Sequence, residues 1–300
     1  MRLTRRTLLA GGAAAIAGAR AWANTTLSLG AVTVDTLSDG NLVMPFEFQF
    51  GDLPENEVRE ILSRHGIEGD EMTPPCNVTL MRDGTNTVLF DVGAGPGFMP
   101  SAGKLWEALD ILGVSPEDVT HVVFTHAHPD HLWGVLDDFD DPVFMNARYA
   151  IGRAERDYWF DPATPDAIGE ERLAFAAGAL RYLGAIEDAL EVVEDGQEIL
   201  PGIAARMTPG HTPGHMAYEI RGGGEAVMVL GDSILNQHVA FERPDWPSGS
   251  DQDPEMAAAT RRRLLDQLAT DQMAFIGFHL PFPGIGRAEK RDGAYRFVPA

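Results

Sequence analysis

Four side chains that can bind a metal ion crowd one short stretch of the sequence. Beginning at His126, the chain reads His-Ala-His-Pro-Asp-His. Imidazoles and carboxylates at this density are unfavourable unless a cation lies between them. His126 and His128 are two positions apart and point the same way, whereas Asp130 and His131 follow the kink at Pro129 and can face a second position. The spacing therefore predicts a metal centre, and two ions fit it better than one.

Further metal-binding side chains occur at three later places. A repeated Pro-Gly-His sequence contains His211 and His215, a Gly-Asp-Ser sequence contains Asp232, and a Phe-His-Leu sequence contains His279. Each alone has an ordinary structural explanation: Gly-Asp-Ser and Pro-Gly-His are common in turns and loops, and a single histidine is often buried in a core. Combined with the first cluster, they favour one larger metal site.

In type and order, these sequences resemble the H-x-H-x-D-H signature and the later ligand motifs of the metallo-β-lactamase superfamily. The resemblance implies that the first metal is bound by His126, His128 and His211, that the second is bound by Asp130, His131 and His279, and that Asp232 bridges both. It also places Asp91 and His215 behind the site as supporting residues. A strand-end turn is the alternative role for Asp91.

The resemblance covers essentially the whole chain from residue 24 and implies an α/β fold. That fold is an αβ/βα sandwich of two mixed β-sheets with outer helices, in one domain over residues 24–300. The pattern of elements agrees: we expect strands within 27–37 and 77–92, a helix within 101–112 and a buried strand at 120–125. We expect mostly helix over 147–186, strands at 204–207, 216–220 and 226–230, a helix from Asp253 to about Leu268, and a strand at 273–277.

The expected chemistry is hydrolysis. Five histidines and two aspartates form a ligand set suited to Zn²⁺, which Mn²⁺, Fe²⁺ or Co²⁺ can also use. Two divalent ions sharing a water lower its pKa towards ~7, so a bridging hydroxide can attack an electrophilic carbon or phosphorus. Asp130 and Asp232 are the predicted catalytic carboxylates. The sequence thus predicts a metal-dependent hydrolase that acts on ester bonds.

Within the superfamily, the sequence resembles the branch that includes methyl parathion hydrolase and the acyl-homoserine lactonases. The run at 277–286 carries this resemblance, and Asp232 counts against the β-lactamases. The lactonases carry a tyrosine three positions after the bridging aspartate, where this chain has Leu235. The predicted substrate is therefore a neutral, apolar ester, lactone or organophosphate triester. An acyl-homoserine lactonase and a non-catalytic periplasmic metal-binding protein are the alternatives.

Three aromatic residues adjoin the predicted ligands and are candidates for an apolar wall of a substrate pocket: Phe98, Trp133 and Phe282. Each has a place in the core as its alternative. His238 is interpreted as a residue of a surface loop and is left out of the site. Residues 261–263, three consecutive arginines, are interpreted as a solvated helix face. An apolar stripe of Leu173, Ala176, Ala177, Leu180 and Leu183 is predicted to be core.

Composition restricts the partners. The chain has 23 Lys and Arg against 45 Asp and Glu, a net charge of −22. An acidic surface repels phosphate backbones and anionic lipids, so we expect neither nucleic-acid binding nor stable membrane insertion of the mature chain. Cys76 is the lone cysteine and has no partner for an internal disulfide. A small neutral molecule is the expected partner, and a homodimer is left open.

The first 23 residues have the layout of a signal peptide. Arg5 and Arg6 precede a short stretch rich in Gly and Ala, and Ala21-Trp22-Ala23 offers a cleavage site. The paired arginines resemble a twin-arginine export signal. An uncleaved N-terminal anchor is the alternative. We therefore expect a periplasmic or secreted protein.

Overall fold

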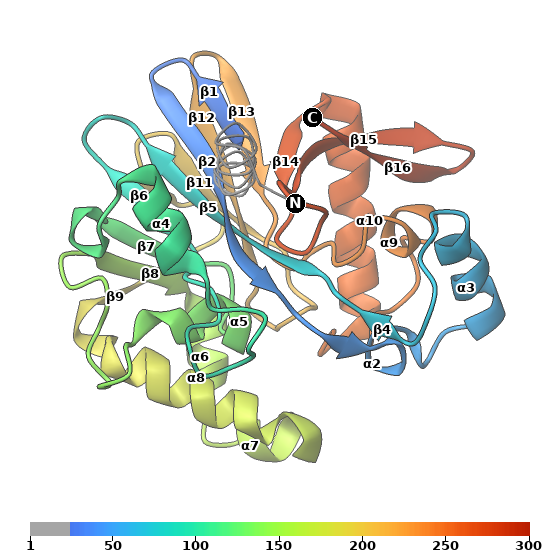
Figure 1. Ribbon diagram of the computed structural model, residues 1–300, viewed down its shortest axis with the longest axis horizontal. Helices are drawn as coiled ribbons and strands as arrows, with labels where there is room; N and C mark the ends of the chain where they lie inside the picture. The colour runs from blue at the N-terminus through green and yellow to red at the C-terminus, as the bar shows by residue number, and fades with distance from the viewer. Residues whose placement is uncertain (1–24) are drawn as a thin grey trace, which may run out of the picture.

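Two seven-stranded sheets face each other in the computed structural model, which describes residues 25–300 (Figure 1). The predicted signal peptide lies outside the described residues. In sheet order, the first sheet consists of β1 (Thr25–Leu29), β2 (Val32–Asn41), β5 (Pro75–Arg82), β6 (Thr87–Phe90), β7 (His121–Phe124), β8 (Arg148–Gly152) and β9 (Leu190–Val193). The second consists of β10 (Glu198–Leu200), β11 (Ile203–Met207), β12 (Met216–Gly222), β13 (Glu225–Val229), β14 (Ala274–Ile276), β15 (Ile285–Arg291) and β16 (Ala294–Pro299).

Both sheets are mixed. Strands β6 to β9 run parallel to one another, as do β13 and β14, and the remaining neighbours within the two sheets are antiparallel. A separate two-stranded ribbon pairs β3 (Met44–Pro45) with β4 (Glu71–Met72). The mixed sheets with helices outside them confirm the predicted fold class.

Helices cover the outer faces of the sheets (Figure 1). Beside the first sheet lie α4 (Leu105–Leu112), α5 (Pro129–Leu132), α6 (Arg153–Phe160), α7 (Thr164–Ala167) and α8 (Leu173–Ala185). Beside the second lie α9 (Val239–Glu242) and α10 (Pro254–Asp271), and α2 (Phe46–Phe50) and α3 (Glu55–Ser63) follow β3. Among the described residues, no helix is long and apolar enough to cross a membrane.

Apolar side chains fill the space between the two sheets. Phe90 and Val123 of the first sheet pack with Tyr218 and Val227 of the second, and all four are almost fully buried. Val122, the neighbour of Val123, belongs to the cluster on the helix side of the first sheet. A strand buried on both faces is a continuous apolar run, which explains the composition of β7. Each such buried side chain stabilises the fold by about 1.5–3 kcal/mol.

The predicted helical span 147–186 is wrong at its start, because residues Arg148–Gly152 form β8 between β7 and β9. A short buried parallel strand lacks the alternation that distinguishes a strand from a helix. The 3₁₀ turn Pro116–Asp118 leads into β7. The hairpin of β15 and β16 and the helices α2 and α3 were not predicted.

The predicted core stripe of α8 is wrong in part. Of Leu173, Ala176, Ala177, Leu180 and Leu183, only Ala176 and Leu183 are buried, whereas Leu173 is 42% and Leu180 52% exposed. The helix instead packs through small residues. A Cβ atom at Gly178 would lie 2.5 Å from the indole of Trp133, so this close approach requires glycine.

The solvated helix face predicted for residues 261–263 is wrong for Arg261. Its guanidinium is buried and donates hydrogen bonds to Asp251 Oδ2 at 3.0 Å and to the carbonyl of Trp246 at 2.5 Å. Arg262 is exposed, as expected. The first of the three arginines therefore fixes the loop that precedes α10 rather than facing water.

Candidate metal centre

The predicted ligands lie on loops that follow strands of both sheets. His126 and His128 follow β7, and His211 lies between β11 and β12. Asp232 follows β13 and His279 follows β14. Because β13 and β14 are parallel, the last two residues emerge at the same edge of their sheet. The topology thus brings four segments that are far apart in sequence to one place.

A glycine makes the turn into the site possible. Gly231 has φ 51°, and a Cβ atom there would lie 2.7 Å from Nε2 of His215. A larger residue would be strained and would collide with this imidazole. Gly231 thus lets the chain deliver Asp232 beside the histidines.

The Asp232 carboxylate lies at the centre of the cluster. Its Oδ2 atom is 3.3 Å from Nε2 of His211 and 3.3 Å from Nε2 of His279. Its Oδ1 atom is 3.2 Å from Nε2 of His131. Asp130 Oδ2 is 3.2 Å from the same His279 nitrogen. Asp232 therefore contacts residues from both predicted ligand sets.

Potential ligand atoms fall into three groups, in each of which all atoms lie within 4.8 Å of one another. They are His126 with His128 and His211; His126 with His131 and Asp232; and Cys76 with Asp130 and His279. All members are buried. The first group has the composition expected for the first metal. Cys76, to which the sequence assigned no role, lies beside two predicted ligands of the second.

The residues fit divalent metal ions. Four buried side-chain atoms at the centre of the cluster have no hydrogen-bond partner among the described residues: His126 Nε2, Asp130 Oδ2, His131 Nε2 and Asp232 Oδ1. Leaving such groups unpaired is costly, and a cation between them would satisfy them. This arrangement is what a metal-binding site of imidazoles and carboxylates requires.

Burial and neighbouring charges give three of the predicted ligands, His126, His128 and Asp232, the protonation states that metal binding requires. Burial, followed by the charges of the neighbouring imidazoles, holds the pKa values of His126 and His128 well below their usual range. Neutral imidazoles can donate a lone pair to a metal. Burial alone would raise the pKa of Asp232, but the imidazoles of His279 and His131 hold it well below its usual range. Asp232 therefore stays ionised.

Hydrogen bonds from behind orient the ligands. Asp91 Oδ2 is 2.8 Å from Nδ1 of His131, and Asp91 also accepts hydrogen bonds from the backbone and hydroxyl of Thr125 at 2.8 Å. Nε2 of His215 accepts a hydrogen bond from the backbone N–H of Asp232 at 3.0 Å. Asp91 and His215 thus lie in the supporting positions that the resemblance implies.

The sequence did not reveal two further supporting carboxylates. Asp251 Oδ1 lies 3.1 Å from Nδ1 of His211. Glu155 is fully buried and accepts hydrogen bonds from the Ala127 N–H at 3.0 Å and from the Thr212 hydroxyl at 2.6 Å. It thereby joins the two histidine-bearing loops. Neither carboxylate adjoins a ligand in sequence, so only the tertiary fold identifies it.

A cavity of about 260 Å³ opens above the ligands. His128, Asp130, His211, Asp232 and His279 form part of its wall, and Leu42, Val43, Met44, Phe48, Met99, Phe175 and Leu235 contribute apolar side chains. Phe98 also lines it. The prediction is wrong for Trp133 and Phe282, which do not line this cavity. Trp133 stacks on Tyr182 at 5.3 Å and contacts Phe98 edge-on, so it supports the wall from behind.

The fold and the ligand cluster define a metallohydrolase-type site, and comparison with known proteins identifies the family. The metallo-beta-lactamase superfamily model matches residues 73–272, and the chain belongs to this superfamily. An uncharacterised protein of Mycobacterium tuberculosis is 28% identical over 233 residues, which cover 75% of this chain and 91% of that protein.

Two solved structures are similar over nearly the whole chain. AidC, a dizinc quorum-quenching lactonase in complex with a product, is 27% identical with a TM-score of 0.87, covering 93% of this chain and 97% of AidC. The hydrolase AbOPH of the beta lactamase superfamily is 29% identical with a TM-score of 0.85, covering 92% of this chain and 96% of AbOPH. Both neighbours are hydrolases.

Proposed function

We propose that the protein is a hydrolase that uses two divalent metal ions, most simply Zn²⁺, to cleave neutral and fairly apolar esters, lactones or organophosphate triesters. The observation that carries this proposal is the position of the ligand cluster in the wall of a cavity with largely apolar sides. An apolar cavity with a few convergent polar groups is the usual form of a small-molecule site.

His126, His128 and His211 would hold one ion, Asp130, His131 and His279 the other, and Asp232 both. When bound, the ions supply an activated water and an electrophile that polarises the substrate. The chain itself supplies the apolar wall that orients the acyl or leaving group and excludes water. Asp130 lines the cavity beside His128, His211 and His279, so its carboxylate would lie next to a bound substrate.

Charge favours neutral substrates. The net charge of −22 slows the approach of anions, and Arg172 is the one cation that lines the cavity among the described residues. Its guanidinium donates a hydrogen bond to the carbonyl of Gly249 at 2.5 Å, which engages it in holding the wall. Attraction from the metal ions is screened beyond about 8 Å at physiological salt. Neutral esters avoid this long-range repulsion.

The test compares a neutral aryl phosphotriester with its matched diester anion on one metal-loaded preparation at two salt concentrations. We expect a higher kcat/KM for the triester than for the diester at both salt concentrations. A diester preferred at both salt concentrations would refute the neutral-substrate proposal. No turnover of esters, lactones or triesters, with none restored by Zn²⁺ after chelation, would instead support a metal-binding protein without catalysis.

An acyl-homoserine lactonase is the second candidate, favoured by the similarity to the lactonase AidC. Leu235 weighs against it, because this apolar residue lines the cavity where the lactonases of the resembled branch carry a tyrosine. Comparing kcat/KM for an N-acyl homoserine lactone and for an open-chain ester with the same acyl group distinguishes the candidates. A strong preference for the lactone would support the lactonase.

We also propose that the protein is exported in folded form and acts in the periplasm or outside the cell. The support is the paired Arg5 and Arg6 and the small residues at 21–23. Replacing both arginines by lysine should retain the precursor in the cytoplasm. Normal export of that double variant would contradict the twin-arginine route.

A further inference from the structure

Four of the five predicted histidine ligands have a partner behind the ring, on the side away from the metal centre. The partners are the Thr125 hydroxyl, 3.0 Å from Nδ1 of His126; Asp91 Oδ2, 2.8 Å from Nδ1 of His131; Asp251 Oδ1, 3.1 Å from Nδ1 of His211; and the Pro75 carbonyl, 2.9 Å from Nδ1 of His279. Such partners fix the orientation of a ligand ring. The fifth histidine, His128, therefore needs a partner as well.

His128 faces the cluster through the opposite ring nitrogen. Its Nδ1 atom lies 2.9 Å from Nε2 of His211, and these two histidines form one group of potential ligand atoms with His126. The nitrogen of His128 that would bind a metal ion is therefore Nδ1. The other ring nitrogen, Nε2, lies 3.3 Å from Nε2 of Gln252. Gln252 thus occupies the position behind His128.

The backbone holds Gln252 beside a second ligand of the same predicted metal ion. Its N–H group donates a hydrogen bond to the carbonyl of His211 at 3.1 Å, and the N–H group of Asp253 donates to the carbonyl of Gly210 at 2.9 Å. These two bonds fasten the chain before α10 to the loop that carries His211. The side chain of Gln252 then reaches His128 from a fixed place.

Gln252 also has an unused hydrogen-bond acceptor. Its Oε1 atom is buried and has no hydrogen-bond partner among residues 25–300. A neutral imidazole that gives Nδ1 to a metal carries its proton on Nε2, and this N–H group needs an acceptor. A half-turn of the amide about its Cγ–Cδ bond brings Oε1 to that position. Gln252 can therefore supply the acceptor that metal-bound His128 requires.

We propose that Gln252 is a positioning residue for the first metal ion. Its amide oxygen would accept a hydrogen bond from Nε2–H of His128 and so fix both the tautomer and the orientation of this ring. The inference rests on the metal centre of the proposed function. Gln252 does not line the cavity above the ligands, so it would act through His128 and not on the substrate. Its effect should be confined to one of the two metal ions.

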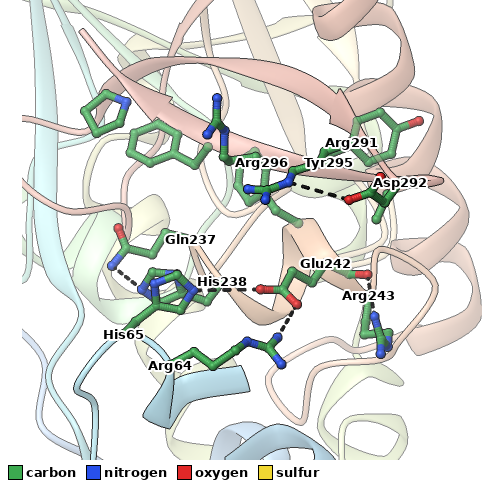
Figure 2. Close-up of a pocket in the computed structure, with 14 residues that line it drawn as sticks. Arg64, His65, Gln237, His238, Glu242, Arg243, Arg291, Asp292, Tyr295 and Arg296 are labelled. Carbon is green, nitrogen blue, oxygen red and sulfur yellow. Dashed lines mark hydrogen bonds and ion pairs between the residues drawn. The ribbon is translucent and has the colours of Figure 1, made fainter. Parts of the chain in front are cut away.

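A similar pair of an amide and an imidazole lies outside the metal centre and provides a matched control. The Nε2 atom of Gln237 is 2.9 Å from Nε2 of His238 (Figure 2). Both residues line a separate cavity of about 690 Å³, and none of the predicted metal ligands lines it. His238, interpreted from the sequence as a loop residue outside the site, thus lies in this second cavity. Gln237→Met removes an amide from an imidazole that binds no predicted metal ion.

The test measures the affinity of the metal-free protein for each zinc ion by competition with a chromogenic chelator. Gln252→Met keeps the length of the side chain but removes the acceptor. We expect it to weaken the binding of one zinc ion by about 10- to 100-fold and to leave the other within about twofold. Gln252→Glu retains an acceptor oxygen and should bind both ions at least as tightly as the unmodified protein. Gln237→Met should match the unmodified protein.

Unchanged zinc affinity in Gln252→Met would overturn the inference. Equal weakening of both ions would do the same, as would equally weak binding by Gln252→Glu or an equal loss in Gln237→Met. Circular dichroism of the metal-free variants, expected to match that of the unmodified protein, separates lost binding from lost folding. No turnover is measured, so the result does not depend on whether the protein hydrolyses esters. If only one zinc ion binds, the two-metal proposal fails, and the affinities of the variants for that ion still decide the role of Gln252.

Discussion

Asp232 is the residue at which the two predicted ligand sets meet. Its two oxygens face His211, His279 and His131 at 3.2 to 3.3 Å, and its backbone N–H is bound by His215. The carboxylate is thus held in position from behind while both oxygens face the cluster. Removing its charge without changing its shape should affect the metal centre more than the fold.

We predict that Asp232→Asn lowers kcat/KM for an aryl ester by about 100-fold or more and weakens the binding of metal. An amide cannot serve as an anionic bridge between two cations. Asp245→Asn removes an equal charge from an exposed position and should leave both quantities unchanged. Comparable activity in the two variants, measured at saturating zinc, would contradict the bridging role.

Glu155 is not a predicted metal ligand, but it holds the two loops that carry His128 and His211. One of its oxygens accepts hydrogen bonds from Ala127 N–H and Trp159 Nε1, and the other accepts hydrogen bonds from the Thr212 hydroxyl and Gly214 N–H. Four donors on two oxygens require a carboxylate, because an amide would turn an NH₂ group towards one pair of them. Glu155 therefore positions the loops of His128 and His211 together.

We predict that Glu155→Gln lowers zinc affinity by about 10- to 100-fold, the usual effect of losing a residue that orients ligands. Competition with a chromogenic chelator measures it directly. Glu191→Gln, at an exposed glutamate on β9, is the control and should retain full affinity. Unchanged zinc affinity in Glu155→Gln would show that the two loops are held by other contacts.

At the scale of elements, one buried carboxylate fixes the segment that carries Phe98. Asp39, at the end of β2, accepts hydrogen bonds from the backbone N–H groups of Ala94 at 2.8 Å, Gly103 at 3.1 Å and Leu105 at 2.8 Å. Burial raises the pKa of Asp39 to about 6, against the opposing effect of these N–H groups. The segment that walls the metal cavity is therefore tied to the first sheet.

This pKa predicts a pH-dependent contribution to stability. Because the pKa of Asp39 is higher in the folded protein than its usual 3.8, its contribution is fully present below pH 3.8 and is lost as the pH rises through about 6. The difference in unfolding free energy between the unmodified protein and Asp39→Asn should therefore shrink by about 1 kcal/mol between pH 5 and pH 7. Urea denaturation at the two pH values measures it. A difference that grows with pH would show that this pKa is lowered instead.

The candidate ligands could be chosen from the sequence because each lies in a local motif next to a strand. The supporting residues were not, since Glu155 is 28 and 57 residues from Ala127 and Thr212, and only the packing of α6 brings them together. Strand β8 was missed for a related reason. Its burial comes from neighbours on both sides, and periodicity within five residues does not reveal them.

The residues of the cavity wall were also only partly predictable from the sequence. Phe98, Trp133 and Phe282 were equally plausible as aromatic residues near ligands, but proximity in sequence does not fix the direction of a side chain. Trp133 turns away from the cavity because it packs against Tyr182 and Gly178 of α8. Phe98 contacts Trp133 from the other side and lines the cavity. The apolar residues of β3 and α2 that complete the wall have no chemical motif to mark them.

At the scale of the whole molecule, two features support the proposed class of substrate. The two sheets bring the ligands together in a buried cluster, and the surface carries a large excess of negative charge. In the proposed function the cluster would supply the chemistry for ester hydrolysis, and the negatively charged surface would slow the approach of anionic substrates at long range. We propose that both metal positions must be filled for this chemistry.

Stepwise zinc titration of the metal-free protein tests that claim most directly, with bound metal determined by elemental analysis and aryl-ester hydrolysis followed in the same samples. We predict that activity rises until about two zinc ions are bound per chain, because the seven ligands exceed what one four- to six-coordinate ion uses. Full activity at one bound zinc ion per chain, with no further rise at two, would contradict the account.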